Sequence, residues 1–292
     1  MARIRAEFPK LAFARTRLED SGADHRLVIL DEEWVFRFPR TAERVPLFRA
    51  ELQILEALRG APVPPIPDYV FVSGAGVFGG YRLIAGEPLR ARLFRALPGP
   101  IQGRILEEIA ALLRAVHALT PAAITPPGVS PAREWSPADW TARYDAERRG
   151  QIAPFVPPEL LPAIDGFYRA FARRPVSERA VVIHGDLSDD HLLLAPERDR
   201  LAGVIDFGDA CLGDPAYDFT FFFAFGQAAA QRLATLYDPS GADPGLIERA
   251  RWSYARYRIE QLRWIAMGAV PDQSAEIIAE LPGLLSMLAK GE

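Results

Sequence analysis

Two short apolar segments, HLLL (191–194) and LAGVID (201–206), are joined by the polar turn APERDR. This pattern predicts a β-hairpin. Because the start of one antiparallel strand lies beside the end of its partner, His191 and Asp206 should be neighbours at the open end of the hairpin. Asp186 lies in the loop HGDLSDD, which leads into the first strand. The sequence therefore predicts that these three side chains converge, and no other feature constrains the fold as strongly.

The segments before this hairpin predict a small β-rich lobe. Residues 27–38 (LVILDEEWVFRF) have the pattern of two strands around an acidic turn, and further short strands are expected at 69–73 and 80–84. Residues 45–58 carry apolar side chains at helical spacing, and a glycine and a proline cluster end this helix. Residues 1–85 are therefore expected to form a small antiparallel sheet with one helix.

The remaining residues, 86–292, predict a larger, mainly helical lobe. Apolar residues recur at helical spacing in four segments: 101–119, 160–173, 244–267 and 273–289. The chain exceeds the roughly 100–150 residues of a common domain, which also favours two lobes. The expected fold class is α+β, with a boundary near residue 85.

The composition excludes several classes of protein. The net charge is −4, so no nucleic-acid partner is expected. No apolar run of about 18 residues predicts a membrane-spanning helix, and the charged N-terminus lacks the apolar centre of a secretion signal. Cys211 is the single cysteine, so an internal disulfide is impossible and a cysteine-based zinc site is not expected. These features predict a cytoplasmic protein without a membrane partner.

The predicted cluster suits one kind of chemistry. A carboxylate with one other ligand and open positions can hold Mg²⁺, which keeps several waters and takes phosphate oxygens. A separate carboxylate nearby can accept a proton from a hydroxyl group. Together these are the parts that phosphoryl transfer requires.

The same residues carry a resemblance to a known family. His184-Gly185-Asp186, His191 and Ile205-Asp206-Phe207-Gly208 resemble the catalytic and metal-binding loops of the protein-kinase-like fold. The form that begins His-Gly-Asp is similar to the aminoglycoside phosphotransferase family and its relatives among macrolide and choline kinases. The resemblance implies a bilobal fold, Asp186 as catalytic base, and His191 and Asp206 as Mg²⁺ ligands.

The chain departs from the family pattern in three places. His191 stands where Asn is usual; imidazole is a softer ligand and must be neutral to bind a metal, so metal-dependent activity is expected to fall below its pKa, near ~6.5 if unperturbed. Ser188 stands where protein kinases carry a basic residue. Only GDACLGDP separates Phe207 from the next expected helix. This spacing leaves no room for a long activation segment, so no protein substrate is expected.

In the resembling fold, a cation on the third strand holds the donor phosphates and pairs with a helix glutamate. Lys10 and Lys290, the lysines of this chain, lie near its ends. Arg37 is therefore expected to take this role with Glu51 as its partner, and its guanidinium would grip phosphate in a fixed fork. The alternative is that Arg37 and Glu51 form a surface ion pair.

Other residues are expected to complete the nucleotide site. The loop SGADHR, which begins at Ser21, takes the position over the phosphates. The backbone of Arg82 and Ile84 would meet the purine, and Tyr81 would lie at the back of that pocket. In related aminoglycoside kinases a large aromatic residue there goes with GTP use, so the donor is expected to be ATP or GTP. Plain core packing is the alternative for Tyr81.

The helix expected at 244–267 predicts part of the acceptor site. Four of its residues share one face at spacings of three and four: Tyr257, Glu260, Gln261 and Trp264. Aromatic rings and a carboxylate suit a cationic sugar, whereas a stripe that faces the core is the alternative. Three more acidic residues are expected to add negative potential that attracts a polyamine: Asp189, Asp190 and Asp214.

Several polar residues are expected to be structural. Asp214 and Pro215 read as a helix N-cap and first helical position. The resemblance implies that Asp218 braces the backbone of the catalytic loop and that His184 orients this loop. His117 is expected to pack or cap.

These features favour a small-molecule kinase that transfers the γ-phosphate of ATP or GTP to a hydroxyl of an aminoglycoside-like, cationic acceptor. A macrolide or a metabolic alcohol of the choline or homoserine kind is the main rival. A densely acidic acceptor cleft would favour aminoglycosides, and an apolar cleft would favour macrolides. A nucleotide-binding pseudokinase and a metal-dependent hydrolase built on the same cluster are the remaining alternatives.

Overall fold

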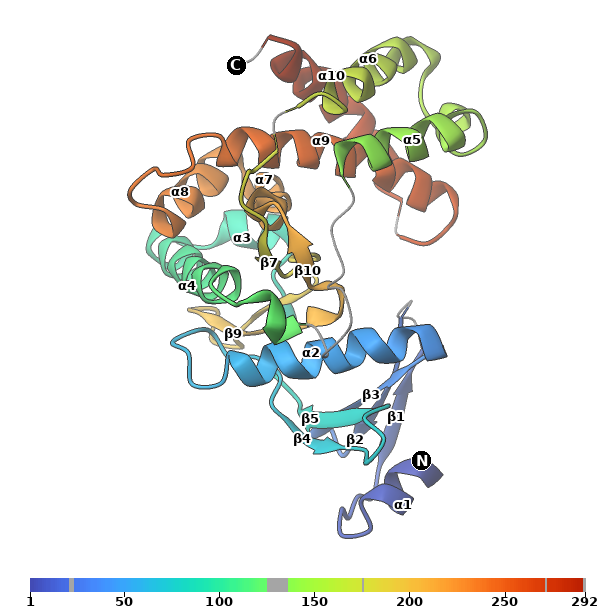
Figure 1. The fold of residues 1–292 in the computed structure, drawn as a ribbon, viewed down its shortest axis with the longest axis vertical. Coiled ribbons are helices and arrows are strands. Elements are labelled where there is room, and N and C mark those ends of the chain that lie inside the picture. Colours follow the sequence, from blue (N-terminus) through green and yellow to red (C-terminus); the bar gives the residue numbers. More distant parts are fainter. Residues whose placement is uncertain (21–23, 125–135, 175, 271, 291–292) are drawn as a thin grey trace.

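The structure, a computed structural model, describes residues 1–20, 24–124, 136–174, 176–270 and 272–290. A sheet lobe lies at one end and a larger helical lobe at the other (Figure 1). The strands are β1 (Thr16–Glu19), β2 (His25–Leu30), β3 (Trp34–Pro39), β4 (Tyr69–Val72), β5 (Gly79–Arg82), β6 (Glu87–Pro88), β7 (Val181–Ile183), β8 (Leu192–Leu194), β9 (Leu201–Val204) and β10 (Cys211–Gly213). The helices are α1 (Ala2–Glu7), α2 (Val45–Ala57), α3 (Ala91–Ala96), α4 (Gly99–His117), α5 (Pro137–Glu147), α6 (Leu161–Phe171), α7 (Phe222–Phe225), α8 (Gln227–Tyr237), α9 (Leu246–Ala266) and α10 (Ser274–Lys290).

The small lobe is an antiparallel sheet in the order β1-β2-β3-β5-β4, with α2 lying along it (Figure 1). Gly79 and Gly80 in β5 leave room for aromatic packing, because a Cβ at Gly80 would lie 2.7 Å from the ring of Phe36. Apolar residues at alternate positions of β2 and β3, among them Val28, Leu30 and Phe36, are buried on the face of the sheet that contains the Phe36 ring. The sheet thereby fixes the position of the side chains on β3.

The large lobe begins at β6, which pairs with β8 of the predicted hairpin, while β7 pairs with β10. The long helix α4 presents one buried apolar stripe to these strands and to α8. β9 also contacts the small lobe at the loop between α2 and β4, where the N–H of Val204 donates to the carbonyl of Pro65 at 2.9 Å. The hairpin therefore lies against both lobes.

A second apolar cluster joins α5, α6, α9 and α10 at the far end of the large lobe (Figure 1). Its largest buried rings are Tyr144 and Tyr168, which stack with centroids 3.8 Å apart. The packing of α9 against α10 in this cluster holds α9 in place.

The α+β bilobal fold is confirmed, and the two strands of residues 27–38, the hairpin and the four helices of the large lobe occur as predicted. The five-stranded sheet ends at Arg82, and β6 already pairs within the large lobe. The boundary near residue 85 stays a prediction. None of the helices in the described part of the chain is long and apolar enough to cross a membrane.

The helix α5 was not expected from the sequence, because it begins at the end of a proline-rich segment, 121–137, whose composition is typical of a connection. Ser136 and Asp139 form a capping box: the Ser136 hydroxyl accepts from the N–H of Asp139 at 3.2 Å, and the Asp139 carboxylate accepts from the N–H of Ser136 at 2.8 Å. Pro137 occupies the first helical position, where it suits a helix. The proline cluster therefore starts a helix here instead of prolonging the connection.

Candidate active site

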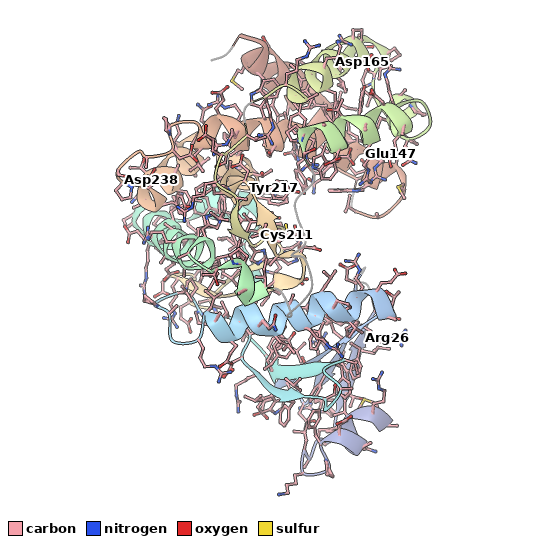
Figure 2. All side chains as sticks on the ribbon, in the orientation of Figure 1. Arg26, Glu147, Asp165, Cys211, Tyr217 and Asp238 are labelled. Carbon is pink, nitrogen blue, oxygen red and sulfur yellow. The ribbon has the colours of Figure 1, made fainter. Side chains whose placement is uncertain are left out.

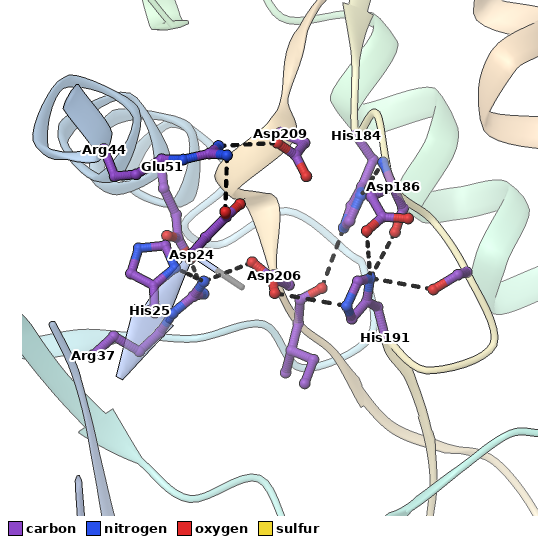
Figure 3. A network of polar contacts seen from close by, with 12 residues as sticks. Asp24, His25, Arg37, Arg44, Glu51, His184, Asp186, His191, Asp206 and Asp209 are labelled. Carbon is purple, nitrogen blue, oxygen red and sulfur yellow. Dashed lines mark hydrogen bonds and ion pairs between the residues drawn. The ribbon is translucent and has the colours of Figure 1, made fainter. Parts of the chain in front are cut away.

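The hairpin brings the predicted cluster together. Leu192 pairs with Val204, and the N–H of Ile205 donates to the carbonyl of His191 at 3.0 Å. The two strand ends therefore lie side by side, and Nε2 of His191 is 3.6 Å from a carboxylate oxygen of Asp206. Figure 3 shows Asp186 on the other side of the same imidazole ring. The predicted proximity of the three side chains is confirmed.

The loop that carries Asp186 is held from below by one buried carboxylate. Asp218 is 1 % exposed and accepts hydrogen bonds from the backbone N–H groups of His184 at 2.7 Å and Gly185 at 3.0 Å. His117 lies 3.0 Å from the same carboxylate. Burial alone would raise the pKa of Asp218, but the hydrogen bond from His117 and the nearby charges outweigh burial and lower it. Asp218 is thus the predicted brace, and His117 is the packed histidine that supports it.

Gly185 is required by the shape of this loop. Its φ is +83°, and a Cβ at this position would collide with the carbonyl oxygen of Asp209. The side chain of His184 is buried, and its Nε2 lies 3.3 Å from the carbonyl oxygen of Ile205. Because burial lowers the pKa of His184 to about 4, this ring is neutral at neutral pH. It can therefore donate to that carbonyl and tie the loop to the second strand of the hairpin.

The hydrogen bonds of His191 define which ring nitrogen is available to a ligand. Nδ1 lies 2.7 Å from the backbone carbonyl oxygen of Asp186, which can only accept. The proton is therefore on Nδ1 in the neutral ring, and the lone pair of Nε2 points toward Asp206. Burial opposes charge on His191, but the carboxylates of Asp186 and Asp206 outweigh burial and raise its pKa.

Asp186 lies in a recess, and its side chain keeps 39 % of its surface exposed. Burial by the surrounding protein is the main cause that raises the pKa of Asp186 to about 6. His191 opposes this shift, whereas Asp209 and other neighbouring carboxylates add to it. A carboxyl group with this pKa is mostly ionised at neutral pH and is more basic than an ordinary aspartate, which suits a group that accepts a proton.

Asp206 also contacts the small lobe. Its residue adopts a left-handed backbone conformation with φ +67°, directly after β9. One carboxylate oxygen accepts from Arg37 at 2.6 Å, and the other faces His191. Burial alone would raise the pKa of Asp206, but Arg37 and His191 outweigh burial and lower it to about 2. This carboxylate is therefore ionised at any physiological pH.

Arg37 lies at the centre of a buried chain of charges (Figure 3). It is 3 % exposed and donates to Glu51, which is fully buried, at 2.7 Å. The alternative of a surface ion pair is therefore wrong. Burial alone would lower the pKa of Arg37, but Glu51, Asp206 and the surrounding groups raise it well above its usual value. Arg37 also donates to Nδ1 of His25 at 3.0 Å, because a guanidinium can only donate.

The pair Asp206 and His191 fits a cation that also takes other ligands. One carboxylate and one imidazole nitrogen face each other, but no cluster of three or more His, Cys, Asp or Glu ligands occurs in the described part of the chain. A cation at this place would therefore need oxygens from water or phosphate. Mg²⁺ is ordinarily bound in this way where phosphates are transferred.

The predicted nucleotide residues fall on the small lobe and its exit. Tyr81 is 5 % exposed and meets Tyr69 edge to face with ring centroids 5.0 Å apart, so core packing accounts for its ring. The side chain of Arg82 is exposed and pairs with Glu33, which leaves only its backbone for the predicted contact. Ile84 lies against Gly203 of β9, at the junction of the lobes. Ser21 lies outside the described residues.

Asp186 and His191 line a cavity of about 650 Å³, which has the size of a small-molecule site. Tyr217 and Cys211 line the same cavity and lie between α2 and the helices α5 and α9 (Figure 2). The predicted residues Tyr257 and Trp264 also line it, and their rings meet at 5.6 Å. A neighbouring cavity of about 700 Å³ shares Tyr257 with it.

Two of the predicted acceptor residues do not reach this cavity. Glu260 is 1 % exposed and pairs with Arg263 at 3.2 Å in the helical core. Asp214 follows the end of β10 that pairs with Val181, whereas Cys211 at the other end pairs with Ile183 beside the catalytic loop. The antiparallel ladder thus carries Asp214 away from Asp186. It caps the next short helix, as predicted, and binds Arg249 at 2.7 Å.

Asp189 and Asp190 do lie on the acceptor side, and a single arginine pairs with both of them. Arg90, just before α3, bridges both carboxylates, with its Nη1 3.4 Å from Asp189 and a direct contact from Nη2 to Asp190. Asp190 lines the cavity that contains Asp186, and Asp189 lines the neighbouring one. One positive charge offsets one of the two negative charges, so the negative potential expected from these aspartates is lowered but not removed.

Tyr217 and Arg256 line the cavity although the sequence did not predict it, and Trp140 lines it as part of the segment EWSPADW, which is a candidate for the wall from sequence. Trp140 lies on the unexpected helix α5, and its ring centroid is 3.8 Å from the guanidinium carbon of Arg256. The segment EWSPADW carried a signal, because its serine and aspartate have the spacing of a capping box. Arg256 directly precedes Tyr257, and helical spacing alone does not show that both reach the same cavity.

The brace at Asp218 leads to a stability prediction. Asp218→Asn leaves one oxygen for two backbone N–H groups and removes the charge beside His117, so we expect a loss of about 3–5 kcal/mol in the free energy of unfolding. Asp145→Asn is the control, because Asp145 is exposed on α5 and should change this free energy by less than about 0.5 kcal/mol. Urea unfolding followed by circular dichroism measures both, and equal stabilities would contradict the assigned brace.

His191 leads to a pH prediction. A protonated imidazole cannot bind a cation, so Mn²⁺ binding in the presence of a non-hydrolysable nucleoside triphosphate should weaken as the pH falls through the raised pKa of His191. In His191→Asn the amide does not titrate, so most of this dependence should disappear. Calorimetric titrations at about pH 8 and about pH 5.5 compare the two proteins. Equal weakening in both would show that His191 is not a ligand.

Comparisons with solved structures support the fold. The structure superposes on the GDP and kanamycin complex of an aminoglycoside 2''-phosphotransferase of type IIIa with a TM-score of 0.77 and 24 % identity, covering 100 % of this chain and 98 % of that one. It superposes on the apoenzyme of a macrolide 2'-phosphotransferase from Brachybacterium faecium with a TM-score of 0.64 and 20 % identity, covering 96 % of each chain.

The sequence comparisons identify the family. An uncharacterised protein of Bacillus subtilis (strain 168) is 22 % identical over 241 residues, which are 77 % of this chain and 75 % of that protein. The family model described as the phosphotransferase enzyme family, abbreviated APH, matches residues 16–259, which include Asp186, His191 and Asp206. The chain belongs to this phosphotransferase family.

Proposed function

We propose that this protein transfers the γ-phosphoryl group of ATP or GTP to a hydroxyl group of a small molecule. The observation that carries the proposal is the convergence of Asp186, His191 and Asp206 at the end of the hairpin, beside a cavity of small-molecule size. The family supports the reaction class, because its members are phosphotransferases.

In this mechanism Asp186 accepts the proton of the acceptor hydroxyl. Its raised pKa, about 6, keeps it ionised at neutral pH while making proton transfer more favourable than for an ordinary aspartate. The brace at Asp218 and the bond from His191 to the carbonyl of Asp186 fix the backbone that carries this carboxylate. The base is thus held on a rigid loop and faces the cavity.

Arg37 is proposed to hold the donor phosphates, with Glu51 fixing the guanidinium from behind. His191 and Asp206 would hold Mg²⁺, which supplies positive charge to the phosphate oxygens. Arg37 now donates to Asp206 at 2.6 Å, so its fork lies beside the proposed cation site and can reach the same phosphate group.

The donor is proposed to be ATP or GTP. The structure superposes on proteins whose complexes contain GDP and, in another case, ATP together with streptomycin. The exit from the small lobe, at Arg82 and Ile84, is the segment proposed to contact the purine with its backbone. We retain Tyr81 as a residue at the back of that pocket, acting by its bulk.

The acceptor class has two candidates. The sequence favours a cationic aminoglycoside, and solved relatives in fold carry kanamycin and gentamicin. The cavity wall favours the rival, a macrolide or a metabolic alcohol, because several aromatic rings line it and Arg90 offsets part of the negative charge next to it. We therefore place an alcohol with an apolar ring surface ahead of a polyamine.

The first test concerns the base. Asp186→Asn should lower acceptor-dependent phosphoryl transfer by about a hundredfold or more while nucleotide binding is retained, since loss of a general base typically costs about 10²–10⁴-fold. Asp199→Asn is the matched control, because Asp199 lies in the turn at the opposite end of the same hairpin. The measurement is nucleotide consumption in a screen of aminoglycosides, macrolides and amino alcohols, with ³¹P NMR of the product.

Unchanged turnover in Asp186→Asn would exclude Asp186 as the base. Two further outcomes would favour the other functions. Nucleotide binding with no transfer to any acceptor in the wild type would favour a pseudokinase, and hydrolysis of a substrate without nucleotide would favour a metal-dependent hydrolase.

The second test concerns the donor. Initial rates with ATP and with GTP at equal concentration should both be measurable, because the backbone contacts proposed for the purine do not require one base. Tyr81→Leu removes ring bulk and should shift the ratio of the two rates toward ATP, by about threefold or more on the scale of one altered apolar contact. An unchanged ratio would assign Tyr81 to core packing alone.

A further inference from the structure

Arg256 is a buried arginine on α9 that faces the cavity of Asp186 without a carboxylate partner. It is 3 % exposed, it lines that cavity, and no ion pair within 4 Å joins it to an acidic residue in the described part of the chain. Its Nε has no hydrogen-bond acceptor there either. A buried charge without a partner is costly, so the position is unusual for an arginine that serves only the fold.

Three other buried arginines of the same helix are paired with carboxylates. Each of the following has a carboxylate partner within 3.2 Å: Arg249 with Asp214, Arg258 with Glu280, and Arg263 with Glu260. The contacts that hold Arg256 are neutral instead: its guanidinium lies over Trp140 at 3.8 Å, and Nη2 donates to the hydroxyl of Tyr217 at 3.3 Å. These contacts orient the guanidinium but do not neutralise it.

The rest of the wall leaves this charge uncompensated. Aromatic side chains that line the same cavity include Tyr217, Phe221, Tyr257 and Trp264. Asp190 is the acidic residue on the acceptor side of this cavity, and Arg90 already pairs with it. Away from the catalytic cluster, the wall therefore presents flat apolar surfaces, the pair of Asp190 with Arg90, and the guanidinium of Arg256 without a carboxylate of its own among the described residues.

We propose that the acceptor carries an anionic group, a carboxylate or a phosphate, that pairs with Arg256, on a body with an apolar ring that packs against the aromatic wall. This inference rests on the proposed phosphoryl transfer and names the class of its acceptor. The guanidinium is buried and held in place before binding, so it can form a charge-assisted pair with an acceptor group that enters the cavity. A polycationic acceptor would instead face repulsion from Arg256.

Arg256 could alternatively act on the transferred phosphoryl group. The two roles differ in what a substitution does. If Arg256 recognises an anionic group of the acceptor, its loss removes the preference among acceptors of different charge. If it stabilises the phosphoryl group, its loss lowers the rates with all acceptors equally and leaves the preference unchanged.

The experiment uses probes that share a benzene ring and a primary hydroxyl but differ in charge. They are 4-(hydroxymethyl)benzoate, 4-(hydroxymethyl)phenyl phosphate, the neutral 4-(hydroxymethyl)benzamide and the cationic 4-(hydroxymethyl)benzylamine. Binding to the full chain is measured by ligand-observed NMR with Mg²⁺ and a non-hydrolysable nucleotide, and transfer from ATP is measured separately by ³¹P NMR. We expect one anionic probe to bind about ten- to a hundredfold more tightly than the amide, on the scale of one charge-assisted hydrogen bond, and the amine to bind most weakly. The two anionic probes distinguish a carboxylate from a phosphate.

Substitutions then assign the preference to Arg256. Arg256→Gln should remove it, and Arg256→Lys, which keeps the charge but not the fork, should retain part of it. Arg169→Gln is the control at an exposed site on α6. Arg90→Gln tests the opposite charge. It removes the partner of Asp189 and Asp190, so it should strengthen binding of the amine probe by about twofold or more. Should Arg256→Gln fail to fold, as judged by circular dichroism, the wild-type charge series and Arg256→Lys still decide.

The outcomes separate this inference from the proposed function. Equal binding of all probes, tighter binding of the amine, or no binding of either anion would overturn the inference, even if transfer to some other alcohol occurs. Anion-selective binding that depends on Arg256 would support it, even if no probe is phosphorylated. A uniform fall in transfer across all probes in Arg256→Gln, with the binding order unchanged, would assign Arg256 to the phosphoryl group and also overturn the inference.

Discussion

The carboxylate of Asp206 is the interaction on which the site depends, because it joins the two lobes and the hairpin at one point. Arg37 of the small lobe donates to one of its oxygens at 2.6 Å, and His191 of the hairpin faces the other at 3.6 Å. Arg37 in turn is fixed by the fully buried Glu51. A buried ionic chain of this kind contributes little net stability, since desolvation offsets much of the attraction, but it specifies one arrangement of its members. That arrangement places Arg37, which is proposed to bind the phosphates, beside His191 and Asp206, which are proposed to bind Mg²⁺.

The loop that carries Asp186 is made rigid by a different set of contacts. Asp218 is buried beneath the catalytic loop and satisfies two backbone N–H groups that would otherwise be orphaned. Gly185 allows the loop to pass close to Asp209, where no side chain would fit. The hydrogen bond from His191 to the carbonyl of Asp186 then links the loop to the hairpin. These contacts fix the backbone of Asp186 in its recess. Burial in this recess is the main cause of its raised pKa.

The sequence predicted the parts of this site that depend on short-range geometry. A hairpin has a fixed pairing direction, so the proximity of His191 and Asp206 followed from two apolar runs and a turn. Asp214 shows the limit of such reasoning, because its distance from Asp186 depends on the pairing of β10 with β7, whose partners are far apart in the chain. Glu260 shows another limit: α9 is buried on more than one side, so helical spacing could not tell the cavity face from the core face. The helix that carries Trp140 was missed because the turn and helix signals of SPAD overlap.

The acceptor wall shows how one family scaffold can serve different substrates. The catalytic cluster is built by the loop and the hairpin, whereas the wall is built by α5, α9 and the segment around Tyr217, so the wall can change without disturbing the chemistry. In this chain Arg90 offsets part of the charge of Asp189 and Asp190, and Arg256 remains without a carboxylate partner in the described part of the wall. The charge that the acceptor meets therefore depends on arginines as well, which the acidic composition of the loop SDD does not reveal. A count of acidic residues near a catalytic loop is therefore a poor guide to the charge of a substrate unless their partners are known.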